Sequence, residues 1–189
     1  GDLVKACWAG GTIQVYVSPT LPSGLTYEAV RTAVMDAFNA LNTGGKQVTQ
    51  RIMKKEELRN VDGSDSLHPN RSGDVVVVLM PPYQSDAGTA NQPIFLSHFF
   101  GQHGYLPDHV DLDNNINMHA TFVAGGPGIK HKKNAEGIRQ IDLAPTVAYL
   151  MNIPGPLNAR GNILYDILDE AGHLEEATIL YLSDFHGQL

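Results

Sequence analysis

The stretch "DVVVVLM", residues 74–80, decides the fold that we expect for this chain. It is an unbroken run of four valines, a leucine and a methionine behind one aspartate, and Pro81-Pro82 follows it. β-Branched residues favour strands, and a strand that is apolar on both faces is typical of a sheet covered on both sides. The stretch therefore predicts a central strand of an α/β protein.

The residues before this run alternate between strand and helix patterns. "GTIQVYVS", residues 11–18, has apolar side chains at every second position, which predicts a strand. From Thr26 onward the apolar residues recur at helical spacing until a Gly-Gly stop signal, and Thr26 is a suitable N-cap. "QVTQRIM", residues 47–53, predicts a further strand, and "KKEELRN", residues 54–60, predicts a short charged helix.

The residues after the run begin with a long stretch, 83–118, that has little periodicity. Such stretches are more often functional than idle. "HATFVAGG", residues 119–126, then predicts a strand, and "IDLAPTVAYLMNI", residues 141–153, predicts a helix with Asp142 as its N-cap. "TILYL", residues 178–182, predicts a last strand.

These elements together predict an α/β fold. We expect residues 74–80 and 119–125 to share one sheet with helices against it. We expect residues 11–73 to form a small α+β subdomain that leads into this sheet.

Composition and charge limit the classes of function. Of the 189 residues, 42% are hydrophobic, which is enough for a real core, and the net charge is -7. An acidic chain is a poor binder of nucleic-acid polymers, and no apolar run is long enough to predict a membrane span. Cys7 is the only cysteine, which excludes internal disulfides and a cysteine-rich zinc site. A phosphorylated substrate stays open, because a metal ion can supply local positive charge.

The first candidate functional residue is His103, in the segment "GQHGY", residues 101–105. Glycines on either side remove Cβ crowding and allow unusual backbone dihedrals. Such surroundings suit a histidine whose ring must meet a ligand at a fixed angle. The alternative is a loop histidine that only makes hydrogen bonds to the backbone.

Asp184 and His186 form the second candidate group, in "ILYLSDFHGQL". An apolar strand brings this Asp-x-His pair to its C-terminal tip, where open α/β sheets bind ligands. A carboxylate and an imidazole at this spacing can both reach a divalent metal ion. The alternative is a polar surface loop after an ordinary strand.

Several motifs along the chain resemble one family. "HPNRSGDVVVVLMPPY", "GQHGYLPD", "MHATFVAGGPGI" and "RQIDLAPTVAYLMNIPGPLNARGNILYDIL" occur in the order found in the C-terminal half of the type I phosphodiesterase/nucleotide pyrophosphatase group of the alkaline phosphatase superfamily. The resemblance covers most of residues 9–168. It implies a partial alkaline-phosphatase-like sheet, an insertion-like subdomain at about 11–73, and His103 as a zinc ligand. The implied reaction uses two zinc ions, an attacking Thr or Ser alkoxide, and a metal-bound hydroxide that releases the phosphate.

The end of the chain resembles a different family. "ILYLSDFHGQL" is similar to the opening strand of the calcineurin-like metallophosphoesterases, especially their 5'-nucleotidase branch. This resemblance implies that Asp184 and His186 are metal ligands. The implied domains are residues 1–168, a linker at 169–176, and the first strand of a second domain at 177–189.

Parts of the first family's site have no match in this sequence. The nucleophile, the first Asp ligand and the D-x-x-x-H and Asp-His ligand pairs are missing. Asp108 and His109 follow G-x-H-G-Y, whereas the family's pair precedes it, and Asp65 and His68 have the wrong spacing. We therefore expect the chain alone to be inactive and to contain no catalytic residue of its own.

The resemblances imply a parent protein that is an exported, metal-dependent phosphoric-ester hydrolase, found in the periplasm, on the cell surface or outside the cell. Its metal ions would be divalent, with zinc expected, and its substrates nucleotides or related phosphate esters. The rest of the parent chain is the other expected partner. The alternative is a non-catalytic binding or assembly module that keeps the family's shape.

Overall fold

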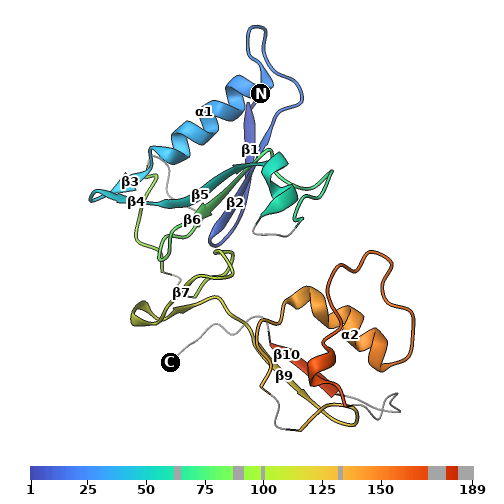
Figure 1. Cartoon of the computed structure of the whole chain (residues 1–189). Coiled ribbons are helices and arrows are strands. Elements are labelled where there is room, and N and C mark those ends of the chain that lie inside the picture. Colours follow the sequence, from blue (N-terminus) through green and yellow to red (C-terminus); the bar gives the residue numbers. More distant parts are fainter. Residues whose placement is uncertain (62–64, 87–91, 99–100, 132–133, 170–177, 183–189) are drawn as a thin grey trace. The chain divides into compact units, whose positions relative to one another are not determined.

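The computed structural model describes residues 1–61, 65–86, 92–98, 101–131 and 134–169, and the backbone of 178–182. The chain divides into two compact units, which we describe separately: unit 1 comprises Gly1–His119, and unit 2 begins at Ala120. Helices and strands are mixed in both, so the predicted mixture of α and β structure is confirmed (Figure 1). No helix among the described residues is both long enough and apolar enough to cross a membrane.

Unit 1 is built on a four-stranded antiparallel sheet with the order β1-β2-β6-β5. The strands are β1 (Val4–Ala9), β2 (Thr12–Val17), β5 (Thr49–Lys54) and β6 (Val75–Leu79). All five residues of β6 are buried, which confirms the predicted central strand. The prediction missed β1, an edge strand whose side chains are mostly exposed.

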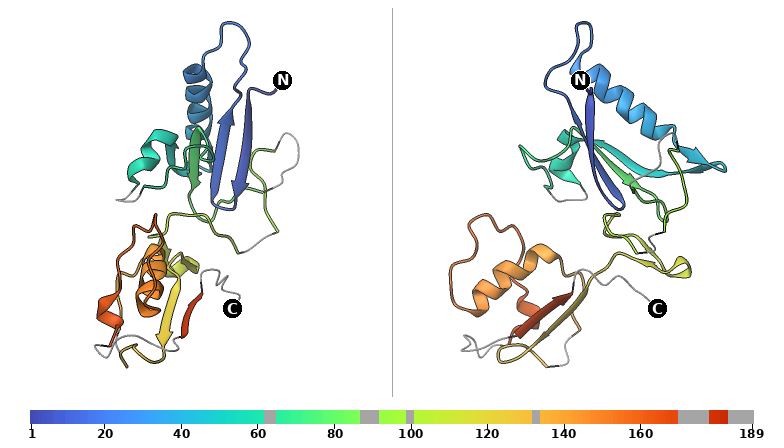
Figure 2. Two further views of the ribbon diagram at one scale, coloured as in Figure 1. Left: turned by 90° about the vertical axis from the view of Figure 1, so that its right-hand side faces the viewer. Right: turned by 180° about the vertical axis from the view of Figure 1, so that it is seen from behind.

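Both faces of β6 are covered, which explains why its sequence is apolar throughout. One face packs with Ile13 and Val15 of β2, and helix α1 (Tyr27–Asn39) adds Val34 and Phe38. The other face packs with Met53 and with Leu58 of the 3-10 helix η1 (Lys55–Asn60). Figure 2 shows α1 lying along the sheet.

The predicted start of α1 is correct, but its predicted end is not. The Thr26 hydroxyl accepts a hydrogen bond from the Ala29 amide at 3.1 Å, so Thr26 caps the helix. The helix ends at Asn39, ahead of the predicted Gly-Gly stop, and Gly44 and Gly45 instead form the turn between the short strands β3 (Asn42–Thr43) and β4 (Lys46–Gln47). Both glycines have positive φ angles, of 56° and 76°, as a tight hairpin requires.

Residues 83–118 are largely irregular where the structure describes them, as the sequence predicts. Their regular elements are the short pair β7 (Val110–Asp111) and β8 (Ile116–Asn117), with the 3-10 helix η2 (Leu112–Asn114) between them.

Unit 2 contains the antiparallel pair β9 (Thr121–Gly125) and β10 (Thr178–Leu182). Helix α2 (Leu143–Leu150) follows the 3-10 helix η3 (Gln140–Asp142), and η4 (Tyr165–Ile167) comes later. The core of the unit consists of Ile129, Leu150, Ile167 and Leu168, with Phe122 and Ala124 of β9 packed against them.

One prediction about these elements is wrong, and another is correct in position only. Residues 74–80 and 119–125 do not share a sheet, because β2 and β5 occupy both edges of β6 and β9 pairs with β10. Asp142 is the N-cap residue of α2, as predicted, but its carboxylate makes no capping bond to that helix. It accepts instead from the amides of Arg139, at 2.9 Å, and Asn162, at 2.7 Å, so it ties η3 to a later loop.

Candidate functional site

The segment that carries His103 is attached to the turn between β1 and β2. The Gly11 amide donates a hydrogen bond to the His103 carbonyl at 2.7 Å, and the Thr12 hydroxyl donates to the Gly104 carbonyl. The backbone is therefore held at His103 and at the residue after it, both against the end of the unit 1 sheet.

Gly104 is required by this attachment. Its φ angle is 86°, in the left-handed region that favours glycine. A Cβ atom at this position would overlap the Ala9 carbonyl oxygen and lie 3.2 Å from the amide nitrogens of Gly11 and Thr12. One of the glycines beside His103 thus has a reason in the fold. The glycine pattern alone therefore does not indicate a ligand-binding histidine.

Tyr105 completes the attachment on the other side of Gly104. Its ring lies so close to Gly11 that a Cβ atom there would be 2.7 Å from Cε1 and 2.8 Å from Cγ. Its hydroxyl donates to the Tyr83 carbonyl at 3.0 Å, and burial raises the pKa of the phenol. Ser85 joins the same turn, because its amide and hydroxyl both donate to the Gly10 carbonyl, at 2.8 and 2.6 Å.

The side chain of His103 is exposed at this place. An exposed imidazole on a fixed backbone can serve as a metal ligand or as a proton carrier. A zinc site normally needs three or four protein ligands. Within the described parts of the chain, no three His, Cys, Asp or Glu side chains gather into such a group, so these residues alone do not form a zinc site.

The other predicted ligands fall elsewhere. Asp184 and His186 lie outside the described residues. Asp108 is exposed and His109 is half-buried, and the amide of His109 closes a turn by donating to the Leu106 carbonyl at 3.0 Å. Neither belongs to a group of three metal-binding side chains among the described residues.

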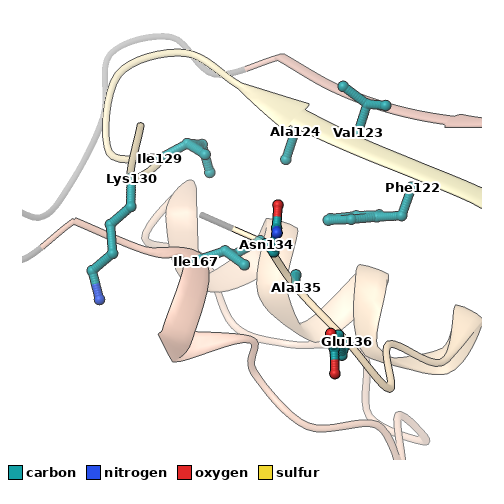
Figure 3. A pocket seen from close by; sticks show the side chains of 9 residues that line it. All are labelled: Phe122, Val123, Ala124, Ile129, Lys130, Asn134, Ala135, Glu136 and Ile167. Atoms are coloured by element: carbon teal, nitrogen blue, oxygen red, sulfur yellow. The ribbon is translucent and has the colours of Figure 1, made fainter. Parts of the chain in front are cut away.

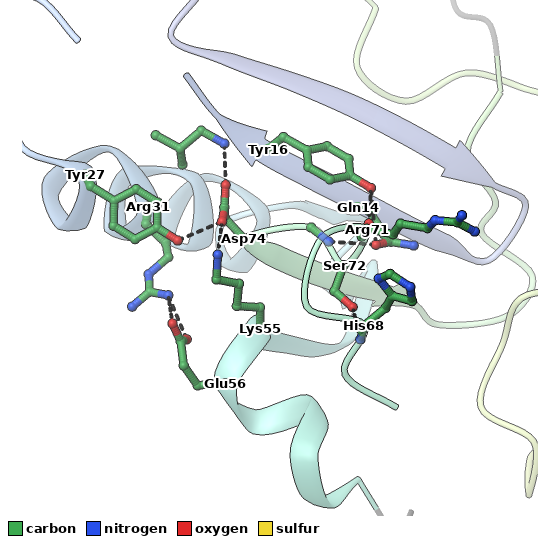
Figure 4. A network of polar contacts seen from close by, with 12 residues as sticks. Gln14, Tyr16, Tyr27, Arg31, Lys55, Glu56, His68, Arg71, Ser72 and Asp74 are labelled. Carbon is green, nitrogen blue, oxygen red and sulfur yellow. Dashed lines mark hydrogen bonds and ion pairs between the residues drawn. The ribbon is translucent and has the colours of Figure 1, made fainter. Parts of the chain in front are cut away.

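A charged network in unit 1 was not predicted (Figure 4). The Asp74 carboxylate accepts hydrogen bonds at 2.8 Å from three donors: the Lys55 ammonium, the Tyr27 hydroxyl and the Val17 amide. Burial opposes ionisation of Asp74, but these three donors outweigh it, so its pKa lies below its ordinary value. The only sequence signal for this network is an aspartate directly before an apolar run.

The same network includes a buried arginine on α1. The Arg31 guanidinium makes two hydrogen bonds to the Glu56 carboxylate, at 3.0 and 2.7 Å, and one to Glu28 at 2.7 Å. Its Cζ atom also lies 5.0 Å from the centre of the Tyr27 ring. These contacts join α1, η1 and the start of β6, which is a structural task.

Unit 2 has a cavity of about 420 Å³ beside β9 (Figure 3). Phe122 and Ala124 of β9 form its apolar wall together with Ile129 and Ile167. Its polar lining comes from Lys130, Asn134 and Glu136, which are exposed. None of the residues predicted from the sequence as ligands lines this cavity.

No protein-family model, curated protein or solved structure matches this chain. The resemblances noted in the sequence therefore stay predictions.

Proposed function

We propose that the protein, as encoded in full, is a metal-dependent phosphoric-ester hydrolase acting on nucleotides or related phosphate esters, with His103 as one of its metal ligands. The attachment of the His103 segment carries this proposal. The His103 and Gly104 carbonyls both accept hydrogen bonds from the β1–β2 turn, while the imidazole is exposed.

This arrangement meets the main physical demand on a metal ligand. A ligand must be held close to its productive position by the surrounding structure, or metal affinity falls. A loop histidine usually lacks such support. Here the neighbouring backbone is fixed to a sheet whose central strand is fully buried.

The order of the sequence motifs gives the proposal its chemistry. A bound divalent metal ion, zinc in the family that the motifs resemble, would activate water and stabilise charge on the phosphate. The remaining ligands and the nucleophile would come from parts of the protein outside the described residues. Asp184 and His186 would serve a second metal site of the metallophosphoesterase type. The domain boundaries after residues 168 and 176, and export from the cytoplasm, belong to the same proposal.

The test compares the full-length protein with its His103→Ala and His119→Ala variants. His119 is also an exposed histidine of unit 1, which makes it a matched control. The measurements are hydrolysis of bis-p-nitrophenyl phosphate and p-nitrophenyl phosphate, and zinc content after dialysis. We expect His103→Ala to lower turnover by at least about 100-fold, since even changes around a ligand cost 10- to 100-fold in metal affinity.

Two results would contradict the proposal. His103→Ala could keep both the bound zinc and the turnover, in which case His103 is not a ligand. The full-length protein could hold no metal and hydrolyse neither ester, which would favour the alternative of a non-catalytic binding or assembly module.

A further inference from the structure

Gly11 and the Tyr105 ring are in close contact beside the backbone of His103. Gly11 does not adopt a positive φ angle, unlike Gly10 and Gly104, so its backbone conformation is open to other residues. Glycine is needed there for space alone, because the Tyr105 ring occupies the volume that a Cβ atom would take.

The same residue makes the hydrogen bond that holds His103. The Gly11 amide donates to the His103 carbonyl at 2.7 Å. His103 lies two residues before Tyr105, whose ring packs on Gly11. A side chain at position 11 must push the Tyr105 ring away. The segment 103–105 would move with the ring, since the two contacts share one short piece of backbone.

The ring itself has little freedom to yield. Its hydroxyl is tied to the Tyr83 carbonyl at 3.0 Å, on the loop that follows the buried strand β6. That loop is in turn tied to the Gly10 carbonyl through Ser85. The ring of Tyr105 is therefore enclosed between the β1–β2 turn and the loop after β6.

We propose that Gly11 and Tyr105 are positioning residues that together fix the place of His103. The contact between Gly11 and Tyr105 is present whatever His103 binds. Its role in holding a metal ligand in place rests on the proposed function. Neither residue touches substrate or metal in this proposal. They act through the backbone between them.

The first test uses this chain without metal and a double-mutant cycle of Gly11→Ala and Tyr105→Ala. The measurements are amide hydrogen exchange at residue 11 and the NMR signals of the His103 ring. We expect Gly11→Ala to speed exchange at residue 11 by at least about tenfold, because its hydrogen bond to His103 is broken. In the Tyr105→Ala background, Gly11→Ala should add little, because the clash is gone.

Two further variants make the test specific. Gly155→Ala is the matched control, because a Cβ atom there meets nothing within 4 Å and the backbone φ is not positive. It should leave the exchange at residue 11 unchanged. Tyr105→Phe keeps the ring but loses the hydrogen bond to Tyr83. We expect Tyr105→Ala to lose protection of the residue 11 amide against exchange, and Tyr105→Phe to retain most of that protection.

The proposal is overturned if Gly11→Ala leaves exchange at residue 11 unchanged, or if the effects of the two alanine substitutions simply add. If Gly11→Ala does not fold, the Tyr105→Phe and Tyr105→Ala variants decide the question. The proposal is then overturned if both variants keep the wild-type exchange rate at residue 11 and unchanged NMR signals of the His103 ring.

The second test measures zinc affinity of the full-length protein. Positioning predicts that Gly11→Ala weakens zinc binding by about 10- to 100-fold, the range found for changes around a metal ligand. If Gly11→Ala leaves zinc affinity intact while His103→Ala abolishes it, the positioning role is wrong and the proposed function stands. If His103→Ala itself leaves zinc affinity intact, the proposed function fails, whatever the exchange data show.

Discussion

The ammonium group of Lys55 and the carboxylate of Asp74 lie 2.8 Å apart, at the point where the chain enters the central strand β6. The Asp74 side chain is only 13% exposed, and its hydrogen bonds reach β2, α1 and η1. One carboxylate therefore connects three elements around the start of the buried strand.

The first prediction is that Asp74→Asn destabilises unit 1 by about 1–3 kcal/mol at pH 7, because the hydrogen bonds to a charged, half-buried carboxylate are lost. The pKa of Asp74 is lowered in the folded state. The ionised carboxylate therefore contributes fully to the free energy of unfolding above the unfolded pKa of about 3.9, and this contribution disappears as the pH falls through the lower folded pKa. The difference between wild type and variant should thus shrink below about pH 4. Urea unfolding followed by the fluorescence of Trp8, the single tryptophan, measures it.

Asp36→Asn is the control for this prediction, since Asp36 is an exposed aspartate of α1. It should change stability by no more than about 0.5 kcal/mol. A gap between wild type and Asp74→Asn that stays constant from pH 7 to pH 2 would contradict the role of the Asp74 charge.

The second prediction is that Gly104→Ala destabilises unit 1 by more than about 1 kcal/mol. The substitution places a side chain at a positive φ angle and makes its Cβ atom overlap the Ala9 carbonyl oxygen. Gly137→Ala separates the two causes. Gly137 also has a positive φ angle, of 67°, but a Cβ atom there meets nothing within 4 Å. In urea unfolding, the Gly104 variant should lose more stability than the Gly137 variant. Equal losses would show that the overlap with the Ala9 carbonyl does not destabilise the folded state.

The third prediction concerns the buried Asp142 of unit 2. Asp142→Ala leaves the amides of Arg139 and Asn162 without their carboxylate acceptor, and should destabilise this unit by about 1–3 kcal/mol. Hydrogen exchange of the Leu164 amide, which donates to the Thr146 hydroxyl at 3.0 Å, reports on the same region. The exposed Asp166 supplies the control, as Asp166→Ala should leave this exchange unchanged.

The fourth prediction is that His103→Ala leaves the thermal stability of this chain nearly unchanged, within about 0.5 kcal/mol, because the side chain is exposed. The hydrogen bond from the Gly11 amide uses the backbone carbonyl of residue 103, which alanine retains. Thermal melts of both proteins in the presence of a metal chelator measure this. A much lower melting temperature for the variant would mean that the imidazole packs or bonds for stability.

The sequence predicted elements whose signal is local. Helix α1 has a capping threonine and an apolar stripe, and β6 has an apolar run of the right length, so both are correct. Strand β1 was missed, because an exposed edge strand needs no apolar alternation. The pairing of β6 with β9 was wrong because apolar strands are interchangeable by composition, and partners are chosen by contacts far along the chain.

The site was predictable to a smaller extent. His103 was found through its neighbouring glycines, but the close packing that requires Gly104 depends on Ala9, which lies far away in sequence. Nothing in the local pattern of Gly11 or Tyr105 indicates that they meet. The network around Asp74 was missed for the same reason, because its donors come from three separate elements.

The position of β6 between β2 and β5 has a consequence for the order of folding. During synthesis β2 and β5 emerge first, and each must wait for residues 75–79 before its inner edge is paired. Closing such long loops is slow compared with forming a hairpin or a helix. The β1–β2 hairpin and α1 can form early, whereas the sheet is completed only when its middle strand is inserted. Until then the backbone N–H and C=O groups along two strand edges are unpaired and open to other chains. This is the stage at which a chaperone would matter most.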